Sequence, residues 1–387
     1  MYDVIVIGGG PSGLNTAKRM AEGGLEVEVL EKKSKIGKDI ICTGIIGEET
    51  FRDFNLSKNL ILKEIKKIKL VSPLGSSLIY QHPITFAYVV DRNKFDEYLA
   101  NITQSKGVEI KLKNQVIDIS VNKDHVEVLT EVKGKYLRKY SAKMAIIATG
   151  VEYRLSKKLG LGFPKDFLNG VQSELEMGYV DSTTIFVGKN IAPRGFAWVV
   201  PISEEKVRIG LITDGDPKVY FQHLIEEFYP KKMANLDKER IQFKSIAHGL
   251  ISKTYGERVL AVGEAAGQVK TTTGGGIYFG LLCSEIASEV ILKRFEDGCF
   301  STKALAEYEK LWKKALQREI LVGYYTRKIL GKLSDLQIEN IFQIAQNDGI
   351  IPLIKEKGNF DWHSEMILAL IKKSPFLEIF GGNHFVY

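Results

Sequence analysis

Cysteine is scarce in this chain of 387 residues, which contains only Cys42, Cys283 and Cys299. An odd number of cysteines so far apart argues against a disulfide framework and against a four-cysteine zinc or iron–sulfur site. The six histidines show no spacing of the kind that holds a metal ion, so we expect no metal site. A small number of cysteines without a pairing pattern is typical of a protein in a reducing cytoplasm.

Long apolar runs are missing as well. None reaches the roughly 18–20 residues that a membrane-spanning helix needs, and the chain opens on a strand-like segment without a secretory leader. No zinc finger or aromatic-rich sheet motif indicates nucleic-acid binding. The net charge of +7 comes from lysines mixed with glutamates, which is typical of a solvated surface; attraction to an anionic substrate or membrane is the alternative. We expect a cytoplasmic protein, with peripheral contact at the inner membrane face as a further option.

The length allows about two domains, and the order of the predicted elements indicates how they are arranged. Residues 2–7 and 25–30 predict buried strands around a helix that starts near residue 14, which is a βαβ unit. A buried strand at 259–262 and a helix at 277–295 return to this pattern late in the chain. Between them, successive short strands typical of an antiparallel sheet are predicted at 170–177, 183–188, 196–202 and 206–213.

A glycine motif, Gly8-x-Gly10-x-x-Gly13, lies between the first predicted strand and its helix. In this context the first glycine permits a tight turn, the second lets backbone approach a pyrophosphate, and the third packs helix on strand. The helix N-terminus adds N–H donors and a positive dipole for the phosphates. Glu31, at the end of the second strand, can accept hydrogen bonds from both ribose hydroxyls and would repel a 2′-phosphate. The motif therefore predicts FAD or NAD as the ligand, not NADP.

A second glycine-rich segment decides between these two cofactors. Gly263-Glu264-Ala265-Ala266-Gly267 is followed by three threonines and by Gly274-Gly275-Gly276 at a predicted helix start. This segment resembles the second flavin fingerprint of the para-hydroxybenzoate hydroxylase superfamily, in which an acid binds a ribityl hydroxyl and the helix start lies under the isoalloxazine. Amide donors at such a helix start would stabilise negative charge on the reduced flavin. FAD is therefore the predicted cofactor.

Four segments narrow the resemblance to the geranylgeranyl reductase family, including the archaeal digeranylgeranylglycerophospholipid reductases. They are Lys35-Ile36-Gly37 followed by the Cys42-Thr43-Gly44 loop, the Val90-Asp91-Arg92-x-x-Phe95-Asp96 run, the Ile191-Ala192-Pro193-Arg194-Gly195-Phe196-Ala197-Trp198-Val199-Val200-Pro201 segment and the late flavin fingerprint. The resemblance covers most of residues 1–310. The chain departs from the family at Thr43 and Glu264, where glycine and aspartate are usual, at Thr271–Thr273, where a proline is usual, and at Thr149, where an aspartate is common.

The resemblance also implies which residues form the site. Arg92 would reach toward the flavin from its helix start, and the Cys42 loop would lie beside the flavin. Phe196, Trp198 and Pro201 would line an apolar tunnel for the substrate, with ordinary sheet core as the alternative for Trp198. The other residues implied to bind the cofactor, besides the two glycine motifs and their acids, are Ser12, Lys32, Cys42, Thr43, Gly44, Ile45, Val116, Thr149, Gly150, Gly275, Gly276 and Ile277.

Family members saturate isolated C=C bonds in polyprenyl chains, which defines the chemistry that the resemblance implies. An isolated alkene is a poor hydride acceptor, so hydride delivery from reduced flavin N5 is expected to be coupled to proton delivery at the other alkene carbon. Cys42 is the candidate catalytic residue, because a thiol near its usual pKa of about 8.5 is mostly protonated at neutral pH. A small buried hydrophobe is the alternative reading of Cys42.

The implied function is FAD-dependent reduction of geranylgeranyl chains in membrane lipids or their precursors. A flavin monooxygenase or halogenase of the same superfamily is the first alternative, since the Gly195–Pro201 run is also similar to the tryptophan motif of halogenases. A non-catalytic lipid-binding or electron-carrier flavoprotein is the second. No further dinucleotide motif offers a resident NAD(P)H site. The expected partners are therefore a polyprenyl lipid and an external reductant, which is a ferredoxin, a reduced deazaflavin or transiently bound NAD(P)H.

Motifs and element order together predict an α/β fold with an α+β insertion. A Rossmann-like FAD-binding domain is interrupted by an antiparallel-sheet substrate domain and followed by a C-terminal helical region. The FAD-binding domain is assigned residues 1–65, 91–164 and 246–310, the substrate domain 66–90 and 165–245, and the helical region 311–387. The amphipathic C-terminal helices are expected to pack on the core or to dock on a membrane.

Overall fold

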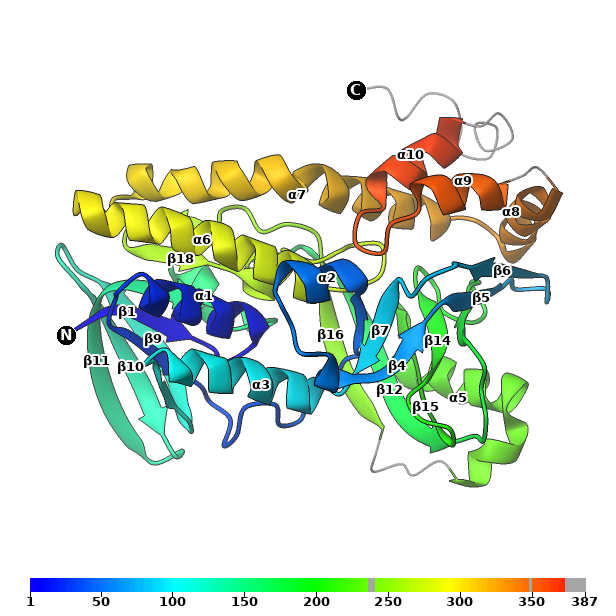
Figure 1. Ribbon diagram of the computed structural model, residues 1–387, viewed down its shortest axis with the longest axis horizontal. Helices are drawn as coiled ribbons and strands as arrows, with labels where there is room; N and C mark the ends of the chain where they lie inside the picture. Colours follow the sequence, from blue (N-terminus) through cyan, green and yellow to red (C-terminus); the bar gives the residue numbers. More distant parts are fainter. Residues whose placement is uncertain (236–240, 348–349, 373–387) are drawn as a thin grey trace. The chain divides into compact units, whose positions relative to one another are not determined.

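The computed structural model describes residues 1–235, 241–347 and 350–372 (Figure 1). It divides into two compact units, each assembled from three stretches of the chain. The first unit comprises Met1–Ile40, Arg92–Asp166 and Ala247–Ile320. The second unit comprises Ile41–Asp91 and the described parts of Phe167–Ile246 and Leu321–Tyr387.

The first unit is built on one sheet of eight strands. Their bounds are β1 Tyr2–Ile7, β2 Val27–Leu30, β8 Glu109–Lys111, β9 Asn114–Val121, β10 Val126–Val132, β11 Tyr136–Ile147, β17 Tyr255–Gly256 and β18 Val259–Ala261. The order is β17-β18-β11-β1-β2-β8, with β10 paired to β11 and β9 to β10. β1 lies parallel to both β11 and β2, and its residues Val4 to Val6 are fully buried. A continuous apolar run of this kind is what a parallel strand covered on both faces requires.

Helices of the first unit are α1 (Pro11–Glu22), α3 (Arg92–Ser105), α4 (Arg154–Lys158), α6 (Ile277–Asp297) and the first part of α7 (Thr302–Leu330). Figure 1 shows α6 and α7 side by side, and Glu307 on α7 pairs with Lys293 and Arg294 on α6 at 3.2 and 3.3 Å. The inner stripe of α7 is completely buried and contains Leu305, Tyr308, Trp312, Leu316 and Ile320. The amphipathic helix predicted over residues 303–333 is thus present, but Leu311, which was expected on the buried side, is exposed.

Two sheets form the described part of the second unit. The larger sheet has seven strands in the order β16-β12-β15-β14-β13-β5-β6, and the smaller has the order β3-β7-β4. In the larger sheet the bounds are β5 Lys67–Val71, β6 Ser77–Gln81, β12 Asp166–Glu176, β13 Thr183–Phe186, β14 Phe196–Pro201, β15 Lys206–Thr213 and β16 Gln242–His248. In the smaller sheet they are β3 Ile45–Gly47, β4 Ile61–Ile65 and β7 Ala87–Val90. The β12–β15–β14–β13 pairs are antiparallel as predicted, but β13 and β5 run parallel.

Helix α5 covers one face of the larger sheet's core, and the smaller sheet packs on the other face. The bounds of the second unit's helices are α2 Glu48–Asp53, α5 Pro217–Phe228, α8 Asp335–Asn347, α9 Ile350–Lys357 and α10 Ser364–Lys372. On α5, Phe221, Leu224 and Ile225 pack with Val199 and Ile209 of the sheet. The opposite face of β14 and β15 packs with residues of the smaller sheet, including Ile65 and Val89. Among the described residues, no helix combines the length and the apolar character that crossing a bilayer would need.

The fold class is confirmed: a Rossmann-like α/β unit is interrupted by a sheet unit, and helices follow. The division between the units differs from the predicted boundaries in two places. Residues 41–65 belong to the second unit, because β3 and β4 both pair with β7. The helices after residue 320 also belong to the second unit, since Phe342 on α8 and Ile350 on α9 pack on Leu78 of β6. Residues 373–387 of the predicted helical region lie outside the described residues.

Candidate functional site

The turn between β1 and α1 is built so tightly that only glycine fits at two positions. Gly8 has φ +115°, and a Cβ there would overlap the carbonyl oxygen of Ala148, just after β11. A Cβ on Gly13 would overlap the carbonyl oxygen of Gly8 itself. The first and third glycines of the motif therefore bring strand and helix into contact, as the spacing predicts.

The second glycine of the motif has a different surrounding. Gly10 caps α1 with φ −84° and ψ 175°, which any residue can adopt. A Cβ built on Gly10 would have no atom of the chain within 4 Å. The backbone at the start of α1 thus borders open space, with the helix N–H groups beside it, and this arrangement fits a pyrophosphate.

Glu31 is fixed by the backbone around the same turn. Its Oε2 accepts a hydrogen bond from Gly9 N–H at 2.7 Å, and its Oε1 accepts one from Lys33 N–H at 2.7 Å. A carboxylate offers about four lone-pair positions, so two remain for hydroxyl donors. The carboxylate is therefore oriented in advance, and it fits the ribose role that the sequence predicts.

Ser12 links the first glycine motif to the late one. A Cβ on Gly263 or on Gly280 would overlap the Ser12 hydroxyl. Gly263 also has φ +67°, a left-handed conformation that glycine adopts freely. Both this backbone conformation and the close Ser12 hydroxyl therefore require a glycine at the start of the late motif. The two glycine motifs, at Gly8–Gly13 and from Gly263 onward in the sequence, therefore meet at one point of the first unit.

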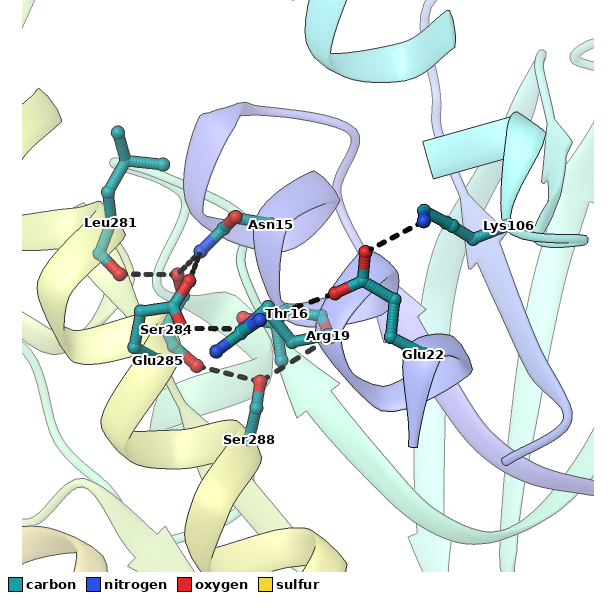
Figure 2. Close-up of polar contacts among 9 residues, drawn as sticks. All are labelled: Asn15, Thr16, Arg19, Glu22, Lys106, Leu281, Ser284, Glu285 and Ser288. Carbon is teal, nitrogen blue, oxygen red and sulfur yellow. Dashed lines mark hydrogen bonds and ion pairs between the residues drawn. The ribbon is translucent and has the colours of Figure 1, made fainter. Parts of the chain in front are cut away.

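Polar contacts continue this junction along α1 and α6 (Figure 2). Asn15 Nδ2 donates to Ser284 Oγ at 2.7 Å and to Glu285 Oε1 at 2.8 Å. Arg19 Nε pairs with Glu285 Oε2 at 2.6 Å. Ser12 of α1 lies against Gly280 of α6, and the later residue Asn15 contacts the later residue Ser284. Because the contacts advance in the same direction along both helices, α1 and α6 run parallel. Their N-termini therefore point to the same end of the first unit.

A buried glutamine that the sequence reading missed holds the late motif in place. Gln268 is fully buried, and its Oε1 accepts from Gly263 N–H at 2.7 Å. Its Nε2 donates to Tyr308 Oη at 2.8 Å, and the Tyr308 hydroxyl donates to Ala261 O at 3.1 Å. A polar side chain directly after the motif's last glycine is the only signal that the sequence carries for this network.

Glu264 and Gly150, which are both predicted cofactor residues, lie close together in the first unit. The Glu264 carboxylate lies 3.6 Å from the position that a Gly150 Cβ would take. The neighbouring Thr149 hydroxyl donates to Glu152 O at 2.7 Å, so it closes a local turn. Tyr153, absent from the predicted set, donates its hydroxyl to Glu264 O at 3.0 Å. Burial and the Glu264 charge raise the pKa of Tyr153, so this hydroxyl stays protonated and remains a donor.

The loop before α6 contains a buried lysine that was not predicted. Lys270 is 6% exposed, and its Cε lies 3.3 Å from the position of a Gly275 Cβ. Lys270 N–H donates to Gly275 O at 2.8 Å, and His248 Nε2 donates to Thr271 O at 3.1 Å. This loop therefore holds Gly275, Gly276 and Ile277 at the start of α6 with a cation packed against it.

Three further predicted cofactor residues lie in the first unit. Arg92, the first residue of α3, pairs with Asp96 at 2.8 Å. Lys32 pairs with Glu152 at 3.3 Å, and Val116 is buried in β9 with its carbonyl accepting from Arg154 at 3.1 Å. Their contact with a cofactor stays a prediction.

The predicted cysteine loop, residues 42–45, belongs to the second unit. Gly44 N–H donates to Cys42 Sγ at 3.3 Å, and Gly44 O accepts from Val90 N–H at 2.8 Å. Ile45 begins β3 and lies opposite Val89. Arg208 of β15 donates to Thr43 O at 2.7 Å while it pairs with Glu174 at 2.8 Å. Arg208 therefore anchors this loop to the larger sheet, and no sequence motif indicated it.

Phe196 and Trp198 lie on one face of β14, with ring centroids 5.8 Å apart. Pro201 comes an odd number of residues later, which places it on the other face of a regular strand. Trp198 is buried in the core with Ile65 and Val89, as the alternative reading expected. Its indole N–H has no hydrogen-bond acceptor within the described parts of the chain, and a buried donor of this kind is costly unless a ligand satisfies it.

Comparisons with known proteins agree with this geometry. Residues 5–191 match the pyridine nucleotide-disulphide oxidoreductase family. A digeranylgeranylglycerophospholipid reductase from Methanocaldococcus jannaschii is 32% identical over 88% of this chain and 89% of its own. A solved geranylgeranyl bacteriochlorophyll reductase-like protein from Thermoplasma acidophilum has TM-score 0.85 and 24% identity, covering 97% of this chain and 98% of its own.

A flavin-dependent brominase also has the fold, with TM-score 0.72, but it is only 18% identical over 96% of this chain and 98% of its own. A likeness at that identity shows the fold alone, so it gives the halogenase alternative no separate support.

The fold and the two joined glycine motifs define an FAD-dependent oxidoreductase. Within that class, the identity and coverage of its relatives show that the chain belongs to the digeranylgeranylglycerophospholipid reductase family.

Proposed function

We propose that this protein reduces C=C bonds of geranylgeranyl chains in glycerophospholipids or their precursors. The observation that carries the proposal is the 32% identity, over nearly the whole chain, to a digeranylgeranylglycerophospholipid reductase. The first unit supports it, because the space above Gly10 and the oriented Glu31 carboxylate fit a dinucleotide without rearrangement. Bound FAD supplies the hydride chemistry of the reaction.

The residues of the first unit divide the work of holding FAD. The Gly8–Gly13 turn and the α1 N-terminus would bind the pyrophosphate, and Glu31 would accept the ribose hydroxyls. Glu264, next to Gly150, would accept a ribityl hydroxyl. The Gly275–Ile277 helix start and the buried Lys270 would place positive potential where reduction adds negative charge. Arg92, held by Asp96, would contribute a second cation.

Cys42 is the proposed proton source. Cys42 is half-buried and belongs to a loop that Arg208 holds at Thr43. A thiol in a fixed loop can hold its proton at one position until an alkene carbon accepts it. The nearby apolar face of β14, with Phe196 and Trp198, supports a role in holding the polyprenyl chain.

Two partners follow from such a reaction: the polyprenyl lipid and an external electron donor. A ferredoxin, a reduced deazaflavin and transiently bound NAD(P)H are the proposed donors. Peripheral membrane contact would bring the lipid to the enzyme. Co-sedimentation with anionic vesicles at low salt measures this contact, and protein that stays in the supernatant would end that part of the proposal.

The decisive experiment is anaerobic incubation of the dithionite-reduced holoenzyme with an unsaturated archaeal-type glycerophospholipid. We expect mass spectrometry to show lipid products that have gained pairs of hydrogen atoms. A lipid of unchanged mass, in the presence of fully reduced flavin, would contradict the proposed function.

The role of Cys42 is tested by Cys42→Ala and Cys42→Ser, with the exposed Cys299→Ser as the matched control. Loss of a general acid lowers turnover by about 10²- to 10⁴-fold, while the flavin absorbance should be unchanged. Cys299→Ser should behave as wild type. Full activity in Cys42→Ala would remove Cys42 from the mechanism and leave the reductase assignment intact.

A further inference from the structure

The hairpin of β10 and β11 in the first unit has a tip that is exposed on both faces. Tyr136 and Leu137, the first two residues of β11, are each 68% exposed. Neighbouring residues of a strand point to opposite faces, so these two side chains lie on opposite sides of the tip. The fold therefore leaves an aromatic and an aliphatic side chain in contact with solvent at one place.

The same tip is strongly basic. Residues 131–139 contain four cations and a single acid, Glu131. Lys113 adds another cation, because its carbonyl oxygen accepts a hydrogen bond from Lys133 N–H at 2.8 Å. Lys113, Lys133 and Lys135 are exposed, and none of them forms an ion pair with a residue that the structure describes. Positive charge thus gathers around the two apolar side chains without being neutralised by the chain itself.

The turn at the tip holds these side chains in a fixed arrangement. Lys133 has φ +54° and Gly134 has φ +67°, and Lys135 N–H donates to Val132 O at 3.1 Å. Positive φ at both central residues gives the turn that suits the twist of a two-stranded hairpin. The lysines and the two apolar side chains therefore need little further ordering when a partner covers them.

Another exposed turn, between β5 and β6 of the second unit, differs from this tip in its charge. Leu74 in that turn is 64% exposed, but residues 72–77 contain no basic side chain. Leu74 N–H donates to the Glu339 carboxylate at 3.3 Å, so an acid lies beside it. A single exposed leucine is ordinary on a protein surface. The combination with unpaired lysines is what distinguishes the β10–β11 tip.

The C-terminal helices, which the sequence offered as membrane-docking elements, already use their apolar side chains within the second unit. Phe342 on α8 and Ile350 on α9 are buried in one cluster with Leu78, and Leu370 on α10 packs against that cluster. These side chains stabilise the second unit and are not available to a bilayer.

We propose that the β10–β11 tip docks on an anionic membrane surface, with Tyr136 and Leu137 in the bilayer interface. A flat protein partner covers one face of a hairpin, whereas a bilayer surrounds an inserted tip and buries both faces. Tyrosine is favoured at this interface, and lysines bury their stems while their ammonium groups reach anionic headgroups. The proposal rests on the proposed function, in which membrane contact brings the lipid to the enzyme, and it adds the surface that makes this contact.

The test measures co-sedimentation of the full-length, FAD-loaded protein with phosphatidylcholine vesicles, with and without phosphatidylglycerol as the anionic lipid. Two double variants separate the two contributions. Lys133→Gln with Lys135→Gln removes charge, and Tyr136→Ser with Leu137→Ser removes apolar surface. Because these side chains are exposed, their replacement should leave folding unchanged.

Two control variants match these changes at other places. Leu74→Ser replaces a similarly exposed leucine in the turn of the second unit. Lys310→Gln with Lys314→Gln removes the same amount of charge from exposed positions on α7. Both controls should bind vesicles as wild type does.

We expect wild type to bind the anionic vesicles at least about tenfold more tightly than the neutral ones. The lysine variant should lose about tenfold in affinity for anionic vesicles at low salt, and this difference should disappear in about 1 M salt. The Tyr136 and Leu137 variant should bind more weakly at both salt concentrations. Equal binding of the two kinds of vesicle by wild type, or equal losses in the controls and the tip variants, would overturn the proposal.

Hydrogen exchange locates the contact independently of affinity. Amides of residues 132–138 should exchange more slowly when anionic vesicles are present, while those of residues 72–76 should not change. Protection confined to other segments would overturn the proposal. Tip-dependent binding of an acidic protein such as a ferredoxin, without vesicle binding by wild type, would also overturn it and assign the tip to a protein partner.

Reduction assays separate this proposal from the proposed function. Both tip variants should reduce lipid in neutral detergent micelles at the wild-type rate, but should show a raised KM for lipid in anionic vesicles. Tip-dependent vesicle binding without any reduction would leave the docking surface standing and defeat only the reductase assignment. An unchanged KM for vesicle lipid in both tip variants would overturn the docking surface and leave the reductase assignment intact.

Discussion

The glycine motifs of the first unit and strand β14 of the second differ in how the buried polar side chains beside them are satisfied. In the first unit, Gln268 and Asn15 are buried with partners that satisfy them, and each joins segments far apart in the sequence. In the second unit, Arg327 is buried beside another arginine, and Trp198 keeps an indole N–H without an acceptor in the described residues. Satisfied groups stabilise a backbone shape, whereas the buried Trp198 N–H costs free energy that an acceptor on a ligand would restore.

The two units therefore differ in the groups that would select their ligands. The first unit fits its cofactor through backbone geometry, and its buried polar groups keep that geometry fixed. In the second unit, the predicted substrate residue Trp198 is a buried side chain whose N–H would gain an acceptor if a ligand supplied one. Substitutions should therefore affect folding and cofactor content in the first unit, but ligand preference and turnover in the second.

The largest effect is expected from Gly13→Ala, compared with Gly10→Ala. The Gly13 Cβ would overlap the Gly8 carbonyl oxygen, so we expect a loss of about 3 kcal/mol in the free energy of unfolding and little bound FAD. Gly10→Ala meets no atom of the chain and should change that free energy by less than about 0.5 kcal/mol. Its FAD affinity should still fall at least about tenfold, because the methyl group enters the pyrophosphate space. Urea denaturation and flavin titration measure both; normal FAD affinity in Gly10→Ala would place the pyrophosphate elsewhere.

Gln268→Leu should come next in size. It leaves Gly263 N–H and the Tyr308 hydroxyl without their buried partner, which costs about 2–3 kcal/mol of unfolding free energy. The exposed Gln222→Leu on α5 is the control and should have little effect. Equal stability of the two variants, measured in urea, would mean that buried polar groups do not stabilise the first unit.

Arg208→Met should lower turnover without changing the cofactor. It removes the hydrogen bond to Thr43 O and the pair with Glu174, so the cysteine loop loses its anchor to the sheet. Misplaced reacting groups cost about tenfold to a hundredfold in rate. Glu174→Gln, which leaves the Thr43 bond in place, should lose less. A fall in FAD content with Arg208→Met would contradict the division of roles between the units.

Arg327→Met should change stability much less than Gln268→Leu does. Burial lowers the pKa of Arg327 to about 10, so at neutral pH the native state carries the full desolvation cost of a charged guanidinium. Replacing Arg327 also ends its electrostatic repulsion with Arg194. The avoided desolvation and the avoided repulsion together offset the loss of the hydrogen bond to Arg194 O. The unfolding free energy should change by less than about 1 kcal/mol, in contrast to Gln268→Leu. A loss as large as that of Gln268→Leu would make Arg327 a structural residue.

How far the sequence predicts this molecule depends on the range of each interaction. Gly8, Gly13 and Glu31 act within one βαβ unit, and their spacing alone gave the turn and the oriented carboxylate. The helix from Thr302 to Leu330 followed from its apolar stripe. The boundary of the second unit was missed because β3 and β4 pair with β7 through long-range contacts that leave no periodic signal in residues 41–65.

Within the candidate site, the same limit applies to single side chains. Gln268, Lys270 and Arg208 each look like ordinary polar residues in the sequence, and only tertiary contacts show that they are buried. Arg194 was read as part of a family segment, and its arginine neighbour on α7 lies more than 130 residues later in the chain. Tertiary packing, not local propensity, decides these positions.

The junction of Ser12 with Gly263 and Gly280 also sets an order of events during synthesis. Asn15 and Ser284, which are hydrogen-bonded in the folded protein, are separated by 269 residues. While the chain is being made, α1 leaves the ribosome long before α6, and the whole of β3 to β16 emerges in between. Contacts of such long range form slowly, and the first strands must wait with their apolar surface exposed. The two glycine motifs thus meet only after α6 (Ile277–Asp297) has been made, and nascent chains that stop before α6 lack the Ser12–Gly280 contact.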